Sequence, residues 1–295
     1  MGSSMLTWLA PTLAATFAWG IAQGLVKKYI GNVLPARFCL YFAAANAFVG
    51  TSWWCLNGTH DVFAEPNRDF LTYGLLVYVL DGIAWIFYFQ SIVYGPISII
   101  GTLSAAYPAI TILFAHLILG EQMTVPQYVG VVAVIGGCLT LAHAPPEADQ
   151  KESQKRWMGF AGAALLIWGG NGTIIKKAYT LAGANDGNFA LFMSIGGGLT
   201  LGVYGFLFGR QEAIDMRAWA RSFLPMATMG LGGLMALIAY KNGSASIVTP
   251  LAGSYPVVTL MFAMIALKER PTKLHWGGIV SILFGFFMTV HGAVG

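Results

Sequence analysis

Long apolar segments, separated by short polar ones, dominate the chain. At 1.5 Å per residue, an α-helix of about 20 residues crosses a hydrocarbon core of about 30 Å. Only 9% of the residues are charged and 57% are hydrophobic, whereas about a quarter of a soluble chain is charged. The pattern therefore predicts an all-α integral membrane protein with ten transmembrane helices, at 6–26, 36–56, 70–92, 96–119, 125–143, 158–178, 188–208, 222–241, 246–267 and 273–293.

The second half of the chain repeats the first. Residues 95–137 align without a gap to 243–285, with 15 of 43 positions identical. Trp19-Gly20 returns as Trp168-Gly169 at almost the same shift. Each repeat holds five spans, an odd number, so the second copy must enter the bilayer from the opposite side. The sequence thus predicts two inverted five-helix repeats, an arrangement typical of transporters with a pathway between the halves.

Polar and charged residues gather between the spans. The longest polar stretch, 145–156, is predicted to be a linker that joins a first repeat at 1–144 to a second at 157–295. The net charge of +4 is spread over the loops, without a basic run interleaved with aromatic residues. Nucleic-acid binding is therefore not expected.

Several short motifs recur in both halves in the same order and spacing. The second half contains Asn242-Gly243-Ser244-Ala245-Ser246 before Pro250, Ser254-Tyr255-Pro256, Leu267-Lys268-Glu269-Arg270 and Gly277-Gly278. The first half contains Tyr107-Pro108 and Leu119-Gly120-Glu121, and each half has an early Trp-Gly pair. The motifs resemble those of the EamA module, which defines a branch of the drug/metabolite transporter (DMT) superfamily.

The resemblance implies a ten-helix basket of two inverted repeats around a central cavity. It also implies secondary rather than ATP-driven transport. We expect an exporter or exchanger of small polar metabolites such as amino acids or amines, working by alternating access in a bacterial inner membrane. The alternative is an intramembrane lipid-acting enzyme or a lipid-translocating protein. An enzyme would need a nucleophile with a base, or a metal cluster, and the spans offer neither apart from Asp81.

The orientation in the membrane stays open at this stage. The loops after the first, fifth, seventh and ninth spans carry 12 Lys and Arg residues, and those after the second, sixth and eighth carry 4. The positive-inside rule then places both termini outside the cytoplasm. The family resemblance implies the opposite, with both termini in the cytoplasm.

Asp81 is the only carboxylate near the middle of a predicted span. A carboxylate in a membrane is costly unless it is hydrated, paired or protonated, so it marks a candidate substrate site. Tyr78, Trp85 and Tyr88 share its face of the third helix. The repeat mates of these three residues and Asp81 are apolar or small: Met226, Met229, Gly233 and Ala236. The cavity is therefore expected to be lopsided. The alternative is that Asp81 is a structural acceptor and the aromatic residues are core.

Two further pairs are candidates for the cavity wall. Trp19 and Gln23 lie one turn apart on the first helix, and Trp168 and Asn171 occupy the corresponding part of the sixth. An amide in hydrocarbon must find partners, which a cavity supplies as water or substrate. For the tryptophans, anchoring at the membrane interface is an equal alternative. Asn46, in the second span, is expected to bond between helices.

Tyrosine-proline pairs fall within the fourth and ninth spans. Pro108 and Pro256 each remove a backbone hydrogen bond, so they predict either a gate or a static kink. The hydroxyls of Tyr107 and Tyr255 need partners and are candidates for substrate contact. Glu121, in the loop after the fourth span, matches the loop acid of the family and is expected to organise that turn.

No cofactor or metal site is predicted. Cys39, Cys55 and Cys138 are too widely spaced for a ligand cluster. The expected partners are a small-molecule substrate, membrane lipids and, if Asp81 ionises during transport, protons as the coupling ion. The protein is expected to be a monomer or a homodimer.

Overall fold

The computed structural model describes residues 2–29, 33–94, 106–142, 156–209, 215–268 and 272–294. The first repeat contains α1 (Gly2–Tyr29), α2 (Pro35–Asn57), η1 (Glu65–Asn67), α3 (Arg68–Tyr94), α5 (Tyr107–Leu119) and α6 (Val125–Ala142). The second contains α7 (Arg156–Ala178), α8 (Asp186–Gly197), η2 (Gly198–Gly202), α9 (Val203–Gly209), α10 (Met216–Asn242), α11 (Ala245–Ala252), α12 (Pro256–Ala266) and α13 (Lys273–Val294). The predicted all-α class is confirmed.

The helices match the predicted spans to within a few residues, apart from α10, which begins six residues before the predicted eighth span. Among the described residues, seven helical stretches are long and apolar enough to cross a membrane, and α5 and α6 are shorter apolar helices. The helix α2 completes the set of ten. The predicted start of the fourth span, up to residue 105, lies outside the described residues. Large apolar side chains such as Leu56, Ile265 and Phe287 are exposed on the outer faces, as expected for contact with lipid.

Helix ends fall where the sequence supplies caps. The side chain of Asn185 accepts hydrogen bonds from the N–H groups of Gly187 and Asn188 at the start of α8. The carboxylate of Asp215 likewise accepts from the N–H of Arg217 at the start of α10. These residue types are preferred helix caps because their side chains satisfy free backbone donors. The helices α2, α5 and α12 each begin with proline in the first turn.

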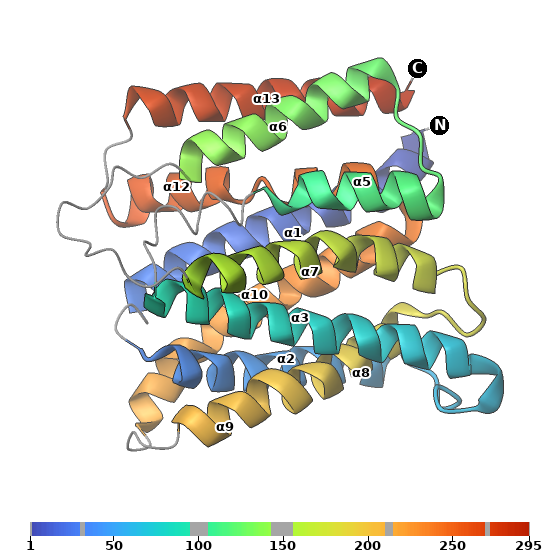
Figure 1. Ribbon diagram of the computed structural model, residues 1–295, viewed down its shortest axis with the longest axis vertical. Helices are drawn as coiled ribbons and strands as arrows, with labels where there is room; N and C mark the ends of the chain where they lie inside the picture. The colour runs from blue at the N-terminus through green and yellow to red at the C-terminus, as the bar shows by residue number, and fades with distance from the viewer. Residues whose placement is uncertain are drawn as a thin grey trace.

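The packing of the helices follows the repeat. The helix α1 packs on α10, and α3 packs on α7. These two contacts are equivalent, because α7 is the repeat mate of α1 and α10 is the repeat mate of α3. The repeat mates α2 and α8 pack together, as do α6 and α13. Figure 1 shows α1 and its repeat mate α7 running in opposite directions, and both termini at the same end of the molecule. The two repeats are therefore inverted.

Glycines bring the outer pair, α6 and α13, into close contact. A Cβ atom added at Gly285 would lie 2.5 Å from the carbonyl oxygen of Gly130, and one at Gly137 would lie 2.7 Å from that of Gly278. Gly130 and Gly278 are repeat mates, as are Gly137 and Gly285. The backbones approach each other here because neither helix carries a side chain at the crossing.

Substitution of Gly285 by alanine is expected to destabilise the protein. Its methyl group would collide with the backbone of α6, and forcing extra atoms into a packed contact typically costs about 1–3 kcal/mol. Thermal unfolding of the detergent-purified variant should show a lower melting temperature. Gly277→Ala on the same helix is the matched control, because a Cβ there would meet open space. Equal melting temperatures for the two variants would contradict the close crossing.

The seventh span is not a regular α-helix. Between α8 and α9 the backbone forms a single π-helical turn, η2, after the glycines that end α8. The hydroxyl of Thr200 donates to the carbonyl of Gly196 at 2.7 Å. A Cβ at Gly205 would lie 2.7 Å from the backbone nitrogen of Leu40. Gly205 and Gly209 therefore allow close packing of this span on α2.

Candidate functional site

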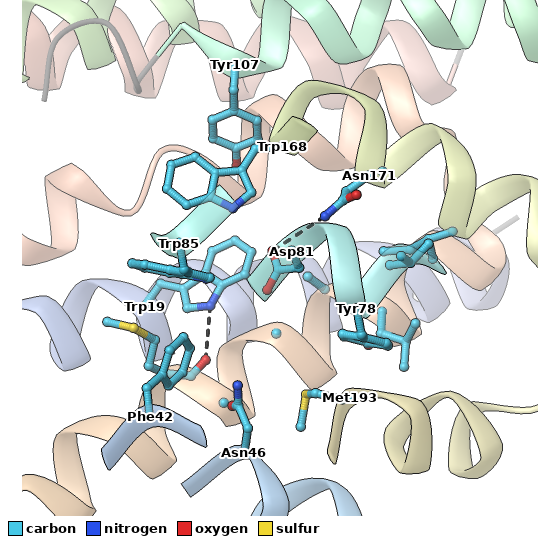
Figure 2. Close-up of a pocket in the computed structure, with 18 of the residues that line it drawn as sticks. Trp19, Phe42, Asn46, Tyr78, Asp81, Trp85, Tyr107, Trp168, Asn171 and Met193 are labelled. Atoms are coloured by element: carbon cyan, nitrogen blue, oxygen red, sulfur yellow. Dashed lines mark hydrogen bonds between the residues drawn. The ribbon is translucent and has the colours of Figure 1, made fainter. Parts of the chain in front are cut away.

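A central cavity of about 180 Å³ lies between helices of both repeats. At roughly 10–15 Å³ per water in such a measure, it has room for on the order of a dozen waters or one small solute. Its walls come mainly from α1, α2, α3, α7 and α10 (Figure 2). All ten side chains predicted to bind substrate line it: Trp19, Gln23, Tyr78, Asp81, Trp85, Tyr88, Tyr107, Trp168, Asn171 and Tyr255. Their contact with a substrate remains a prediction.

Asp81 projects from the middle of α3 into this cavity. Its Oδ1 accepts a hydrogen bond of 3.5 Å from Nδ2 of Asn171 on α7. The indole rings of Trp85 and Trp168 lie near the same carboxylate in the cavity wall. A carboxylate has about four lone-pair sites, so the bond from Asn171 leaves others for a ligand. Among the described residues that line the cavity, none is Lys, Arg or His, and the wall therefore carries negative charge.

Aromatic rings surround the carboxylate. The rings of Trp85 and Trp168 meet edge to face, with 5.1 Å between their centroids, and the ring centroid of Tyr88 lies 5.4 Å from that of Trp168. The ring centroids of Trp19 and Tyr255 lie 6.1 Å apart, and the indole N–H of Trp19 donates to the carbonyl of Met229. The two tryptophans that sequence alone could equally place at the membrane interface therefore lie in the cavity. Aromatic faces attract cations, so these rings and the carboxylate favour the same kind of ligand.

The opposite wall is small and apolar. Met229, Gly233 and Ala236 of α10 line the cavity, as the repeat relation predicts. The prediction is wrong for Met226, which is fully buried and packs in the core beside α2. A Cβ added at Gly233 would meet nothing within 4 Å. This wall therefore leaves space where the α3 wall offers polar groups.

Two amide oxygens in the wall lack partners. Within the described part of the chain, Oδ1 of Asn171 and Oδ1 of Asn46 are buried and accept no hydrogen bond. The sequence predicted an interhelical bond for Asn46, and its oxygen makes none. Buried polar atoms are normally paired. Both oxygens have almost no accessible surface, so a solute in the cavity does not reach them in this conformation.

The tyrosine-proline pairs lie at helix starts. Pro256 begins α12, and the turn at 253–255 separates it from α11, so the ninth span is broken rather than kinked. The sequence offered only a gate or a kink there. Pro108 is the second residue of α5. Tyr107 and Tyr255 each stand beside their proline at the cavity, and the role of the prolines as gates stays a prediction.

Comparison with known proteins identifies the fold. The EamA-like transporter family matches residues 6–142 and again residues 155–291.

The chain belongs to the EamA-like transporter family.

Other similarities agree with this membership. A crystal structure of another protein superposes with a TM-score of 0.79, over 99% of this chain and 98% of that one, at 17% identity. At that identity the likeness shows the fold alone. An uncharacterized protein of Methanocaldococcus jannaschii, MJ1333.1, is 34% identical over 76 residues, which are 26% of this chain and 56% of that protein. The aligned segment thus spans little more than half of that relative. This EamA-like protein is accordingly an integral membrane protein of a transporter family.

One end of the EamA-like fold is tied together by Glu121. Its Oε1 accepts from the N–H of Ala245 at 2.8 Å, and its Oε2 accepts from the N–H and the hydroxyl of Ser246 at 2.9 and 2.7 Å. The carboxylate therefore caps α11 of the other repeat. The expectation that this side chain organises its own turn is wrong, because the turn at Gly120 is closed by backbone bonds and a positive φ of 67°.

A second set of polar contacts surrounds this cap. Nζ of Lys176 donates to the carbonyls of Tyr240 and Lys241, the last turn of α10. Lys241 in turn forms an ion pair with Asp186, with 3.2 Å between Nζ and Oδ1. A cation is favourable at a helix C-terminus because the free carbonyls carry partial negative charge. Together these contacts join α5, α7, α8, α10 and α11 at one end of the transporter.

Sequence reasoning missed several cavity residues. Tyr240 lines the cavity, and its hydroxyl contacts that of Thr249 at 2.9 Å. Gly172 lies beside both, since a Cβ there would approach the tyrosine oxygen at 2.9 Å. Phe42 and Met193 also line the wall. A signal existed for Tyr240, a polar aromatic residue one turn beyond Ala236 on α10, whereas Phe42 and Met193 read as ordinary apolar residues.

Proposed function

We propose that this EamA-like protein is a secondary transporter of small amines, including amino acids. The observation that carries the proposal is a buried carboxylate within an aromatic cavity whose described lining has no basic side chain. A protonated amine supplies the missing positive charge, and the rings of Trp85 and Trp168 add cation–π attraction. Anionic solutes such as nucleotides would meet repulsion from Asp81.

Transport is proposed to follow alternating access between the inverted repeats. Substrate sites of such folds lie near the bilayer midplane, at the repeat interface, often beside broken helices. The cavity receives walls from both repeats, and the break in the ninth span lies at Tyr255 on its edge. We further propose protons as the coupling ion, with Asp81 as the carrier, net export or exchange of substrate, and residence in a bacterial inner membrane.

A thermal-shift screen of the detergent-purified protein tests the substrate class. Amino acids, alkylamines, sugars and nucleosides are compared at equal concentrations. Stabilisation by amines, followed by their uptake or exchange in proteoliposomes, is the expected result, because a ligand that binds only the folded state raises its stability. Stabilisation by sugars or nucleosides with no response to any amine would contradict the proposal.

Gly233→Leu is expected to narrow the range of amines that bind. The new side chain would fill the open space on α10, and overpacking costs about 1–3 kcal/mol, or roughly tenfold in affinity. Binding of 2-phenylethylamine should weaken more than that of ethylamine in thermal-shift titrations. Gly277→Leu is the control, since its Cβ also meets open space but lies on an exposed part of α13. An unchanged affinity for both amines would place the substrate elsewhere.

A further inference from the structure

The described lining of the central cavity carries one acidic side chain and no basic one. Asp81 is its only carboxylate, and none of the described lining residues is Lys, Arg or His. The sequence extends this to the parts of the walls between the helix ends. No basic residue occurs at 1–26, 38–59, 69–115, 157–175, 222–240 or 242–267. An ammonium group therefore finds a countercharge in the cavity, and a carboxylate does not.

The first basic residue beyond the cavity on α7 is already engaged. Lys176 follows Ile175, which lines the cavity, but it is not itself a lining residue. Its Nζ donates to the carbonyl oxygens of Tyr240 and Lys241 at 3.0 and 3.4 Å. These bonds hold the ammonium group at the C-terminus of α10. Lys176 is therefore no partner for an anion in the cavity.

Helix N-termini are the other common partners of a carboxylate, because their free N–H groups and partial positive charge attract anions. Transporters with broken spans use half-helices in this way. The break in the ninth span puts the start of α12 at the edge of the cavity, beside Tyr255. However, Pro256 has no N–H, and the N–H of Val257 donates to the carbonyl of Ser254 at 3.1 Å. The first two residues of α12 therefore offer no donor to a ligand.

The start of α5 offers few donors for the same reason. Pro108 has no N–H, and the N–H of Ala109 donates to the carbonyl of Ala106 at 3.0 Å. The wall on α10 is apolar, and Met229 and Gly233 line the cavity there. The cavity thus provides a countercharge on one side and apolar contacts on the other.

We propose that the cavity binds solutes with one positive charge and an apolar remainder, and selects against a carboxylate on the same molecule. Monoamines then bind more tightly than the amino acids that share their side chains. This inference rests on the proposed amine transport and narrows its substrate class. In an α-amino acid a single carbon atom separates the ammonium from the carboxylate. An ammonium bound at Asp81 therefore brings a second negative charge close to the first, and like charges repel strongly away from bulk water.

Neutral donors in the wall do not offset this repulsion. The amide of Gln23 lines the cavity and can donate to a carboxylate. That bond replaces one that the carboxylate makes with water, so its net contribution is small. The carboxylate still loses hydration without gaining a countercharge, which is costly in a protein interior. A hydroxyl group in place of the carboxylate carries a much smaller cost.

Phenylalaninol and phenylalanine test the inference on the unmodified protein. They share the ring, the amino group and the chiral carbon, and differ in having a CH₂OH group or a carboxylate. At a pH where both amino groups are protonated, phenylalaninol should bind at least about tenfold more tightly in thermal-shift titrations. 3-Phenylpropanoate keeps the ring and the carboxylate without the amine, and it should not stabilise the protein.

Gln23→Lys then assigns the preference to the charge of the wall. Gln23 is partly exposed and lines the cavity, and lysine adds a cation there in a side chain of similar size. The ratio between the affinities for phenylalaninol and phenylalanine should fall towards one or below. Gln23→Met is the matched control, since it also removes the amide, keeps a similar size and adds no charge. It should keep the ratio of the wild-type protein. If Gln23→Lys does not fold, the comparison of ligands on the wild-type protein still decides the inference.

The outcomes separate this inference from the proposed function. Failure of every amine to stabilise the wild-type protein would overturn both, as would tight binding of 3-phenylpropanoate. Stabilisation by phenylalaninol with equal or tighter binding of phenylalanine would overturn the selection against a carboxylate and leave amine transport standing. Equal ratios in folded Gln23→Lys and Gln23→Met would show that the charge of the wall does not set the preference.

Discussion

Asp81→Asn is expected to abolish amine binding and amine transport driven by a pH gradient. Asparagine keeps the shape and one acceptor oxygen of the side chain, so the packing between α3 and α7 should persist. The charge that faces the cavity is lost. A hydrogen bond to a charged group contributes about 1.5–3 kcal/mol, and the upper part of that range corresponds to roughly 100-fold in affinity. Thermal-shift titration and proteoliposome transport measure the two effects.

Asp69→Asn is the matched control for this prediction. Asp69 lies on the same helix as Asp81, is exposed, and does not line the cavity. The same chemical change there should leave binding and transport unaltered. Undiminished accumulation of amine by Asp81→Asn would instead make Asp81 a structural acceptor that joins α3 to α7. The tyrosines and Gln23 would then become the main candidates for recognition.

The spans could be predicted from sequence because the thickness of the bilayer fixes their length. Every predicted boundary that the structure describes falls within a few residues of a helix end, apart from the start of the eighth span, where α10 begins six residues earlier, at Met216. Two local departures could not be predicted. The π-turn at Gly198–Gly202 and the break before Pro256 depend on neighbouring helices, since Thr200 sits against Gly82, and Gly253 sits against Tyr107. Glycine and proline permit such departures without specifying them.

The polar wall of the cavity could be predicted because a charge inside a membrane span has few alternatives. Asp81 and the residues on its face, with the amides of α1 and α7, were found by helical spacing and by the cost of burying polar groups. The hydrogen-bond partner of each polar atom could not be predicted. Whether the oxygen of Asn46 bonds to another helix or faces a cavity depends on which helix packs against it, and the spacing within one span does not specify that contact.

The cap made by Glu121 could not be predicted either, because it also depends on which helix packs nearby. Its partners, Ala245 and Ser246, are more than 120 residues away in the chain. The repeat suggests that this acid has a general role, because a glutamate recurs at the same position of the second copy. Only the packing of α5 against α11 shows that the carboxylate ties one repeat to the other.

Glu121→Ala is expected to be strongly destabilising. The change removes three hydrogen bonds to a charged acceptor and leaves the first N–H groups of α11 without the cap that satisfies them. Since Ser244, the residue before this helix, makes no side-chain cap bond, nothing nearby replaces Glu121. The expected loss is roughly 3 kcal/mol, seen as a drop of several degrees in melting temperature. Ser246→Ala removes one of the three bonds and should cost about 1 kcal/mol.

The same substitution should open this end of the transporter. The cap holds α11 beside α10 and α7, where Thr249 is 1% exposed next to Tyr240 of the cavity. If the closed state loses roughly 3 kcal/mol and the open state loses nothing, the open-closed equilibrium shifts by up to about 100-fold. A Thr249→Cys probe, in a variant without Cys39, Cys55 and Cys138, should therefore react with a membrane-impermeant maleimide at least about tenfold faster when Glu121 is alanine.

Glu65→Ala serves as the control for labelling, because Glu65 is exposed and lies outside the contacts of Glu121. It should leave both the melting temperature and the labelling rate unchanged. A fall in melting temperature without faster labelling in Glu121→Ala would make the carboxylate a purely static cap. Faster labelling, reversed when a bound amine favours the closed form, would instead show that the bond between the repeats is broken and remade during transport. The stability of α11 and the access to the cavity would then depend on the same three hydrogen bonds.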